Sequence, residues 1–232
     1  MSRADSRVLA IVQARMSSTR LPGKVLEELG GRRVLDVVIS RLCGARELQG
    51  VVVATSGDAD DHPVAQVAED AGVPVVRGPL EDVLERYRLA AQLHPCEAVV
   101  RITADCPLVD PEVVDEVIGR WREGDEQYVA NVIEPRTYPK GLDVELISRP
   151  ALEIAAGEAS DPYDREHVTP YVRSRPERFA QAGVYHDPPY GGVRLTLDTA
   201  DDLDALRALV GEVGTNARME QLIAALGAEP DR

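Results

Sequence analysis

The segment Arg7–Ala14, with the sequence RVLAIVQA, is followed directly by a polar and basic run, RMSSTRLPGK, over residues 15–24. The first segment is apolar and of strand length, which is typical of a strand buried on both faces. The second contains Pro22 and Gly23 and predicts a loop that leaves the carboxyl end of this strand. Open α/β sheets bind their ligands at that edge. This stretch therefore predicts both the fold class and the place of a site.

Strand-like and helix-like segments alternate over the next hundred residues. Further strands are expected at Val51–Thr55, Pro74–Val76 and Ala98–Thr103. Apolar residues at helical spacing predict helices at Val34–Leu42, 61–71, Leu80–Leu93 and Pro111–Trp121. This alternation predicts an α/β fold with a doubly wound, mostly parallel sheet and helices on both faces.

The pattern changes in the second half, where a proline-rich loop spans Glu134–Gly141. The elements expected here are strands at Tyr128–Val132, Leu142–Ile147 and Arg194–Leu197 and helices at Asp164–Arg173, Ala200–Val213 and Met219–Leu226. The sequence shows no internal repeat and no linker. We therefore predict one domain, residues 1–232, in which about 134–190 form a small excursion inserted before the last strand.

Composition excludes several classes of protein. The chain has 232 residues, of which 44% are hydrophobic and 28% charged, as in ordinary globular proteins. No apolar run approaches the roughly 18 residues that a membrane span needs. Residues 1–7 lack the apolar stretch of a signal peptide, so we expect a cytoplasmic protein without membrane contact.

The net charge of −14 is unevenly distributed. Residues 1–46 contain nine basic and four acidic side chains, whereas the rest of the chain is strongly acidic. An acidic body with few aromatic residues does not suit nucleic-acid binding, which needs a basic face and stacking platforms. A basic N-terminal region in such a protein instead suits a small anionic ligand.

The loop over residues 13–24 has the chemistry of a triphosphate site. It contains Arg15, Arg20 and Lys24, three hydroxyl side chains at 17–19 and a run of backbone amides. Guanidinium groups bind phosphate oxygens through two donors, an ammonium acts as a point charge, and successive amides form an anion nest. The loop matches neither the Walker A pattern nor the dinucleotide glycine pattern. A solvated basic loop is the alternative interpretation.

Two aspartates follow expected strands. Asp105 comes after Ala98–Thr103, and Asp198 comes directly after Arg194–Leu197. Parallel packing of the two strands would bring both carboxylates to one edge of the sheet. Two carboxylates suit Mg²⁺, which takes phosphate oxygens and waters as its other ligands. Each aspartate has a plainer interpretation as a turn or helix-cap residue.

The run IVQARMSSTRLPGKVL, residues 11–26, resembles the signature loop of the cytidylyltransferases that make CMP-activated acids. These include CMP-Kdo and CMP-sialic acid synthetases and, above all, the branch named after spore coat polysaccharide biosynthesis protein F. Five further blocks resemble that branch in the same order: RGPLEDVLERY at 77–87, RITADCPLVDP at 101–111, GLDVE at 141–145, DREHVTPY at 164–171 and LTLDT at 195–199. The resemblance extends over nearly the whole chain, from about residue 8 to 210.

The resemblance implies a Rossmann-like nucleotide-diphospho-sugar transferase fold and a Mg²⁺-dependent enzyme that moves CMP from CTP to an acidic acceptor, releasing pyrophosphate. The acceptor would be a sugar acid or a phosphonate. A homodimer is also implied, with the excursion at about 134–190 as its contact.

The resemblance also implies roles for individual residues. The catalytic residues would be Arg15, Arg20, Lys24, Asp105 and Asp198, the last two as metal ligands. The nucleotide would contact Gln13, Ala14, Arg15, Ser17, Ser18, Arg20, Lys24, Arg77, Asp82, Arg86, Thr103 and Ala104. The acceptor would contact Tyr138, Lys140, Asp143, Glu145, Arg165 and His167. Kdo enzymes commonly have Gln-Gly where this chain has Thr103-Ala104, so the choice of base is open.

Several of these residues also have a purely structural interpretation. Arg77, Asp82 and Arg86 also suit the surface of an amphipathic helix, and His167 and Tyr138 suit the core. Two other functions remain open: a guanylyl- or uridylyltransferase of the same fold acting on a sugar phosphate, and a non-catalytic nucleotide-binding homologue. The loop lacks the Gly-Gly of the former at residues 14–15, and retention of both aspartates with the loop lysine speaks against the latter.

Overall fold

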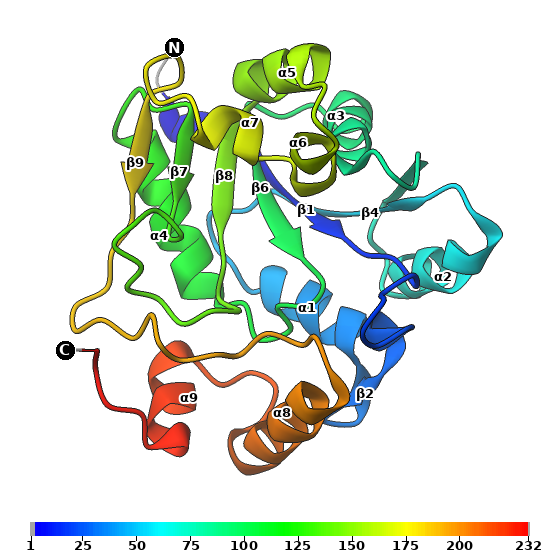
Figure 1. Ribbon diagram of the computed structural model, residues 1–232, viewed down its shortest axis with the longest axis vertical. Helices are drawn as coiled ribbons and strands as arrows, with labels where there is room; N and C mark the ends of the chain where they lie inside the picture. Colours follow the sequence, from blue (N-terminus) through cyan, green and yellow to red (C-terminus); the bar gives the residue numbers. More distant parts are fainter. Residues whose placement is uncertain (1–2, 232) are drawn as a thin grey trace.

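A computed structural model describes residues 3–231 of the chain. Its centre is a seven-stranded sheet with the order β5-β4-β1-β6-β8-β7-β9 (Figure 1). The strands are β1 (Val8–Gln13), β4 (Val51–Ser56), β5 (Val75–Gly78), β6 (Ala98–Thr103), β7 (Tyr128–Ala130), β8 (Glu145–Ser148) and β9 (Gln181–Gly183). Only β8 pairs antiparallel with its neighbours β6 and β7. The predicted α/β class with a mostly parallel sheet is confirmed.

Nine α-helices flank this sheet within the described part of the chain. They are α1 (Val34–Leu42), α2 (His62–Asp70), α3 (Val83–Leu93), α4 (Pro111–Arg122), α5 (Arg149–Glu158), α6 (Pro162–His167), α7 (Pro170–Arg173), α8 (Ala200–Val213) and α9 (Met219–Leu226). One hydrophobic core contains side chains of α1, α2, α4, α8 and α9, and the other contains side chains of α3, α5 and α7. Figure 1 shows α3, α5, α6 and α7 grouped on one side, away from α1, α8 and α9.

Strand β1 joins the two cores. Val8, Ala10 and Val12 belong to one core, while Leu9 and Ile11 belong to the other. Because successive side chains of a strand point to opposite faces, a central strand covered on both faces needs a continuous apolar run. The prediction of a doubly buried strand is therefore confirmed.

The sheet register places two loops side by side. Gln13 at the end of β1 is paired with Thr103 at the end of β6. The basic loop that follows β1 and the turn that carries Asp105 therefore leave the sheet at the same edge. The rest of the connection from β1 to α1 contains a 3₁₀ turn, Lys24–Leu26, and a short hairpin of β2 (Glu28–Leu29) and β3 (Arg32–Arg33).

The expected strand at Arg194–Leu197 is wrong. Only one β-bridge forms there, between Lys140 and Arg194. Farther along, the amide of Leu197 donates to the carbonyl of Asp105 at 2.8 Å. This bond lies beyond the end of β6, so no ladder with a sheet strand develops, yet it holds the segment against the sheet edge.

The structure also differs from the expected elements elsewhere. The helix expected at Asp164–Arg173 is interrupted, because Val168 has a φ of 71° between α6 and α7. Helix α5 and strand β9 were not expected. Helix α5 has a local signal, since the Ser148 side chain accepts from the Ala151 amide and Pro150 occupies the first turn. Strand β9 has none, because its three residues are only half-buried.

Between residues 3 and 231, no helix is both long enough and apolar enough to cross a membrane.

Candidate active site

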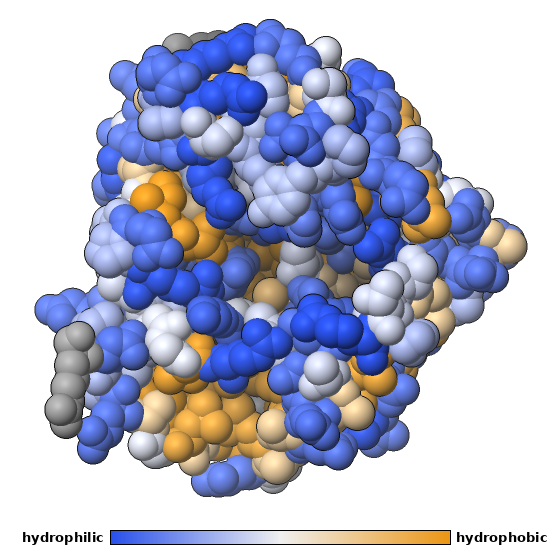
Figure 2. Space-filling view, in the orientation of Figure 1, coloured by the Kyte–Doolittle hydropathy of each residue, from blue (hydrophilic) through white to orange (hydrophobic). Residues whose placement is uncertain are grey.

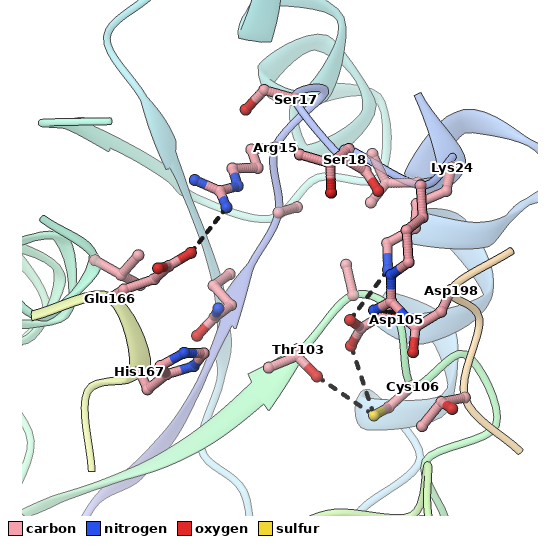
Figure 3. A pocket seen from close by; sticks show the side chains of 18 of the residues that line it. Arg15, Ser17, Ser18, Lys24, Thr103, Asp105, Cys106, Glu166, His167 and Asp198 are labelled. Carbon is pink, nitrogen blue, oxygen red and sulfur yellow. Dashed lines mark hydrogen bonds and ion pairs between the residues drawn. The ribbon is translucent and has the colours of Figure 1, made fainter. Parts of the chain in front are cut away.

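A cavity of about 450 Å³ opens at the carboxyl edge of β1 and β6. Figure 2 shows it as a hollow near the middle of the face in view, and Figure 3 shows the side chains inside it. The predicted site residues that line it are Gln13, Ala14, Arg15, Ser17, Ser18, Arg20, Lys24, Arg86, Thr103, Ala104, Asp105, Asp143, His167 and Asp198. The basic loop and both aspartates thus meet in one place.

The basic loop is folded around the backbone of Met16. The carbonyl of Met16 accepts from the amides of Ser18 and Gly23, each at 2.9 Å. Its amide donates to the buried carboxylate of Asp61 at 2.7 Å. Gly23 has a φ of 74°, a left-handed conformation that glycine adopts without strain. This turn starts the 3₁₀ segment and directs Lys24 into the cavity.

Lys24 joins the two aspartates. Its Nζ lies 3.1 Å from Asp105 Oδ2 and 3.1 Å from Asp198 Oδ1, and it donates to the carbonyl of Leu197 at 2.7 Å. Arg20 and Arg194 also contact Asp198, at 2.8 and 2.7 Å. Partial burial by itself would raise the pKa of Asp198, but the hydrogen bonds from Arg194 and Lys24 hold that pKa below its ordinary value. Asp198 is therefore a carboxylate at neutral pH.

This donor set suits a hard cation. Two carboxylates already share one ammonium group, and carboxylate oxygens are the ligands that Mg²⁺ prefers. No cluster of three or more Asp, Glu, His or Cys side chains that could enclose a metal occurs among residues 3–231. An ion held by the two aspartates would take its other ligands from water and from phosphate oxygens, as Mg²⁺ commonly does.

A second group of side chains faces this one across the cavity. Glu166 and His167 come from α6, and Arg15 Nη2 lies 3.0 Å from Glu166 Oε1. Figure 3 shows these side chains opposite Lys24, Asp105 and Asp198. Burial lowers the pKa of His167 although Glu166 opposes this, so the imidazole is neutral at pH 7.

The wall between the two groups contains Thr103, Cys106 and Arg86. Thr103 Oγ1 lies 3.3 Å from Cys106 Sγ, and burial raises the pKa of that thiol well above its ordinary value. Arg86 on α3 is 1% exposed, and its Nε and Nη1 have no hydrogen-bond partner among the described residues. A buried guanidinium with open donors is costly unless a ligand pairs with it.

Six predicted site residues do not line the cavity. Arg77 donates to the carbonyls of Ser56 and Asp58, at 2.9 and 2.6 Å. Asp82 accepts from the amide of Glu85 at the start of α3 and pairs with Arg165. The contacts of Arg77 connect β5 to the end of β4 and the turn after it, and those of Asp82 stabilise the start of α3 and its connection to α6.

The other three are Tyr138, Lys140 and Glu145. Tyr138 is 2% exposed, and its hydroxyl donates to Glu116 at 2.6 Å. Lys140 is exposed and contributes the bridge to Arg194 through its backbone. Glu145 is buried and pairs with Arg101, which lines the cavity. Asp143 does line the cavity, where it pairs with Arg136.

The prediction missed several lining residues. They are Thr19, Val25, Val83, Arg101, Cys106, Glu166 and Thr196. Glu166 stands beside His167 in the block at 164–171, and Arg101 interrupts the otherwise apolar strand sequence AVVRIT. A charged residue inside a buried strand was the available signal for Arg101.

Comparison with known proteins gives the family. The family model described as cytidylyltransferase matches residues 9–224. The spore coat polysaccharide biosynthesis protein SpsF of Bacillus subtilis is 33% identical over 97% of this chain and 95% of its own. An uncharacterized protein of Methanocaldococcus jannaschii is 36% identical over 84% of this chain and 80% of its own.

Solved structures agree. A cytidylyltransferase from Leptospira borgpetersenii has a TM-score of 0.90 and 31% identity, covering 96% of this chain and 94% of that one. A CMP:2-keto-3-deoxy-manno-octonic acid synthetase complexed with CTP has a TM-score of 0.69 at 18% identity, covering 89% and 99%, and so shares the fold. The chain belongs to the cytidylyltransferase family.

Proposed function

We propose that this cytidylyltransferase moves CMP from CTP to a sugar acid, releases pyrophosphate and requires Mg²⁺. A phosphonate is the second class of acceptor. The observation that carries the proposal is the meeting of the basic loop and a pair of aspartates in one cavity at the carboxyl edge of the sheet.

The basic loop would hold the triphosphate. Arg20 is 61% exposed and is free to turn toward phosphate oxygens, while Lys24 exchanges its aspartate contacts for phosphate. The open donors of Arg86 suit the oxygen atoms of the base or ribose. Thr103 and Ala104 lie in the same wall. The fold shared with a synthetase solved with CTP supports this assignment.

Asp105 and Asp198 would hold the Mg²⁺ ion. When bound, the ion supplies charge neutralisation at the phosphates. The oxygen donors, their sharing of one cation and their position beside the basic loop support this role.

The reaction is an in-line displacement at the α-phosphorus. An acceptor oxygen forms a bond to that phosphorus, the bond to the oxygen bridging the α- and β-phosphates breaks, and pyrophosphate leaves along Arg20 and Lys24. A hydroxyl acceptor must also lose its proton, and the neutral imidazole of His167 would take it. Positioning and charge stabilisation supply most of the acceleration.

We propose further that the chain forms one domain and a homodimer through the excursion at about 134–190. The continuous sheet, which contains strands from both halves of the sequence, supports a single domain. Tyr163 and Tyr185 are 56% and 50% exposed within the excursion, and they supply apolar area for a contact. Sedimentation equilibrium tests the dimer, and Tyr185→Ser is expected to weaken it.

Pyrophosphate release tests the proposed reaction. CTP, GTP, UTP, dTTP and ATP are each combined with Mg²⁺ and with Kdo, sialic, legionaminic and pseudaminic acids, sugar 1-phosphates and 2-hydroxyethylphosphonate. We expect release with CTP and a sugar acid, and its loss in Asp105→Ala. Release only with another nucleotide would contradict the choice of CTP. Failure of CTP with Mg²⁺ to raise the melting temperature would reject the proposed nucleotide site.

A further inference from the structure

Arg101 lies in the cavity but belongs to no part of the triphosphate site. It comes from β6, lines the cavity and has a side chain that is 12% exposed. Its Nη1 donates to Glu145 Oε1 at 2.6 Å. Its Nε is buried without a partner, and its Nη2 donates to no other side chain or carbonyl within residues 3–231. The Nη2 end of the guanidinium, which is not among its buried atoms, is therefore available to a ligand.

Glu145 fixes the position of Arg101. The two residues stand opposite each other in the antiparallel pair of β6 and β8. Glu145 Oε1 accepts from Arg101, and Oε2 accepts from the hydroxyls of Tyr128 and Thr169. Burial alone would raise the pKa of Glu145, but Arg101 and the two hydroxyls hold that pKa below its ordinary value. Both oxygens are thus occupied, so Glu145 positions Arg101 rather than binding a substrate itself.

Stability alone does not explain this pair. A buried ion pair gives little or no gain over apolar side chains of similar volume, and a guanidinium with unpaired donors costs free energy. The remaining strand residues of β6 include Val99, Val100 and Ile102, all fully buried and apolar. An apolar residue would fit this strand, so the open donors of Arg101 point to a ligand.

The position of Arg101 indicates which part of the ligands reaches it. Side chains alternate along a strand, so Arg101 and Thr103 point to the same face, which is the face covered by α3. Arg101 is close enough to His167 to help lower the pKa of that imidazole. In Figure 3, His167 faces the Lys24–Asp105–Asp198 group from across the cavity. A triphosphate held at Lys24, Asp105 and Asp198 would therefore lie across the cavity from His167, which is the side near Arg101.

We propose that Arg101, held by Glu145, binds the carboxylate of the acceptor and makes the enzyme select acceptors that carry this group. The inference rests on the proposed function and identifies the residue that recognises the carboxylate of the acceptor. Two N–H groups of one guanidinium suit the two oxygens of a carboxylate. The base of the nucleotide is the competing ligand, because cytosine also presents acceptor atoms.

The test compares each sugar acid of the panel with its carboxamide, in the CTP-dependent release of pyrophosphate. Arg101→Lys is the main variant, since it keeps the positive charge beside Glu145 but loses the planar guanidinium that can donate two parallel hydrogen bonds. Glu145→Gln tests the positioning role. Arg88→Lys is the matched control, because Arg88 pairs with Glu85 on α3 and does not line the cavity.

We expect the wild type to prefer the carboxylate over the carboxamide by about tenfold or more, as charge-assisted pairing does. In Arg101→Lys, the KM for the acceptor rises about tenfold and the preference shrinks, while the Kd for CTP stays within about twofold. Glu145→Gln changes the same quantities in the same direction. Arg88→Lys should change neither the acceptor KM nor the preference for the carboxylate.

Three results would overturn the inference. One is an equal use of acid and carboxamide by the wild type. Another is an Arg101→Lys variant that binds CTP more weakly but acceptor normally, which would assign Arg101 to the base. The third is a wild type that binds CTP but uses only acceptors without a carboxylate. A wild type that binds no CTP would instead reject the proposed function and this inference with it.

Discussion

The two sides of the cavity hold their charges in different ways. Among the contacts of the basic loop, Arg20 is 61% exposed, and Arg15 and its partner Glu166 on α6 are 34% and 45% exposed, whereas Lys24 and Asp198 are 12% and 15% exposed. Arg101 and Glu145 form what we call the floor of the cavity. Their side chains are 12% and 6% exposed, and each carboxylate oxygen of Glu145 accepts a hydrogen bond. The side chains of Arg15 and Arg20 are reached by solvent, whereas Arg101 and Glu145 are enclosed by β6, β7 and β8.

The two regions would therefore bind a ligand in different ways. The loop arginines would exchange a carboxylate partner for a phosphate, whereas Arg101 is already held in place by Glu145. Exposed ion pairs contribute about 0–1 kcal/mol, so Arg15 and Arg20 can leave their carboxylates for a phosphate at little cost. A buried pair that loses one partner costs about 3–5 kcal/mol, so the floor is fixed before any ligand arrives. The loop side should therefore tolerate mutation in stability but not in catalysis, and the floor should tolerate neither.

The largest expected effect is on catalysis, at the loop side. Asp105→Asn removes one of the two carboxylates that share Lys24 and should lower kcat for pyrophosphate release by about 10² to 10³. Stability should change little, because Asp105 is 33% exposed and Lys24 keeps Asp198. Steady-state kinetics at saturating CTP and Mg²⁺ measure the effect.

Asp204→Asn serves as the matched control, since Asp204 is 78% exposed, pairs with Arg207 and does not line the cavity. Its kcat should equal that of the wild type. An Asp105→Asn enzyme that retained at least a tenth of the wild-type kcat would contradict the role given to this carboxylate.

The next effect compares the same substitution on the two sides. Arg101→Met leaves Glu145 buried without its charge partner and should lower the free energy of unfolding by about 3–5 kcal/mol. Arg15→Met removes an exposed partner of Glu166 and should lower it by about 1 kcal/mol or less. Urea unfolding followed by circular dichroism measures both. Equal losses in the two variants would remove the distinction between the sides.

The sequence predicted the parts of the fold that depend on local pattern. Helices α1, α8 and α9 and strand β6 begin and end where their apolar spacing predicted. The failures occur where tertiary contacts replace pattern. Val168 adopts a positive φ that no β-branched residue favours, and this splits the expected helix into α6 and α7. Residues 194–197 read as a strand but are held by one bridge and one bond to Asp105.

The same division applies to the site. Residues of the basic loop are contiguous, so their common location follows from the sequence once the strand is recognised. Asp105 and Asp198 were expected together, and they do meet, although the expected second strand is missing. Arg101 and Glu145 are 44 residues apart and meet only because β8 runs antiparallel beside β6. Periodicity does not specify which strands pair, so this contact was not foreseen.

A smaller effect should appear as the pH dependence of stability. The pKa of Glu145 lies below its ordinary value of 4.5 in the folded protein, so the ionised carboxylate stabilises the fold above that pH. This stabilisation is lost as the pH falls through the folded pKa. The difference in unfolding free energy between wild type and Glu145→Gln should therefore be constant from about pH 7 to 5 and shrink below about pH 4.5.

Urea unfolding at a series of pH values measures this difference. Arg15→Met is the comparison variant, and its difference from the wild type should stay small throughout because the pair is exposed. If the Glu145→Gln difference stayed constant down to about pH 3, the carboxylate would not be the charged partner of Arg101.

The smallest expected effect concerns Tyr138, a residue that the resemblance assigned to the acceptor. Its hydroxyl donates to Glu116 rather than facing the cavity, and its ring packs edge-on against His186 at 5.6 Å. Tyr138→Phe should therefore lower the free energy of unfolding by about 1 kcal/mol and leave the KM for acceptor and for CTP unchanged. Thermal unfolding and the pyrophosphate assay measure the two quantities. A rise in the acceptor KM without a loss of stability would place the acceptor nearer to Tyr138 than to Arg101, and the cavity floor would lose its assigned ligand.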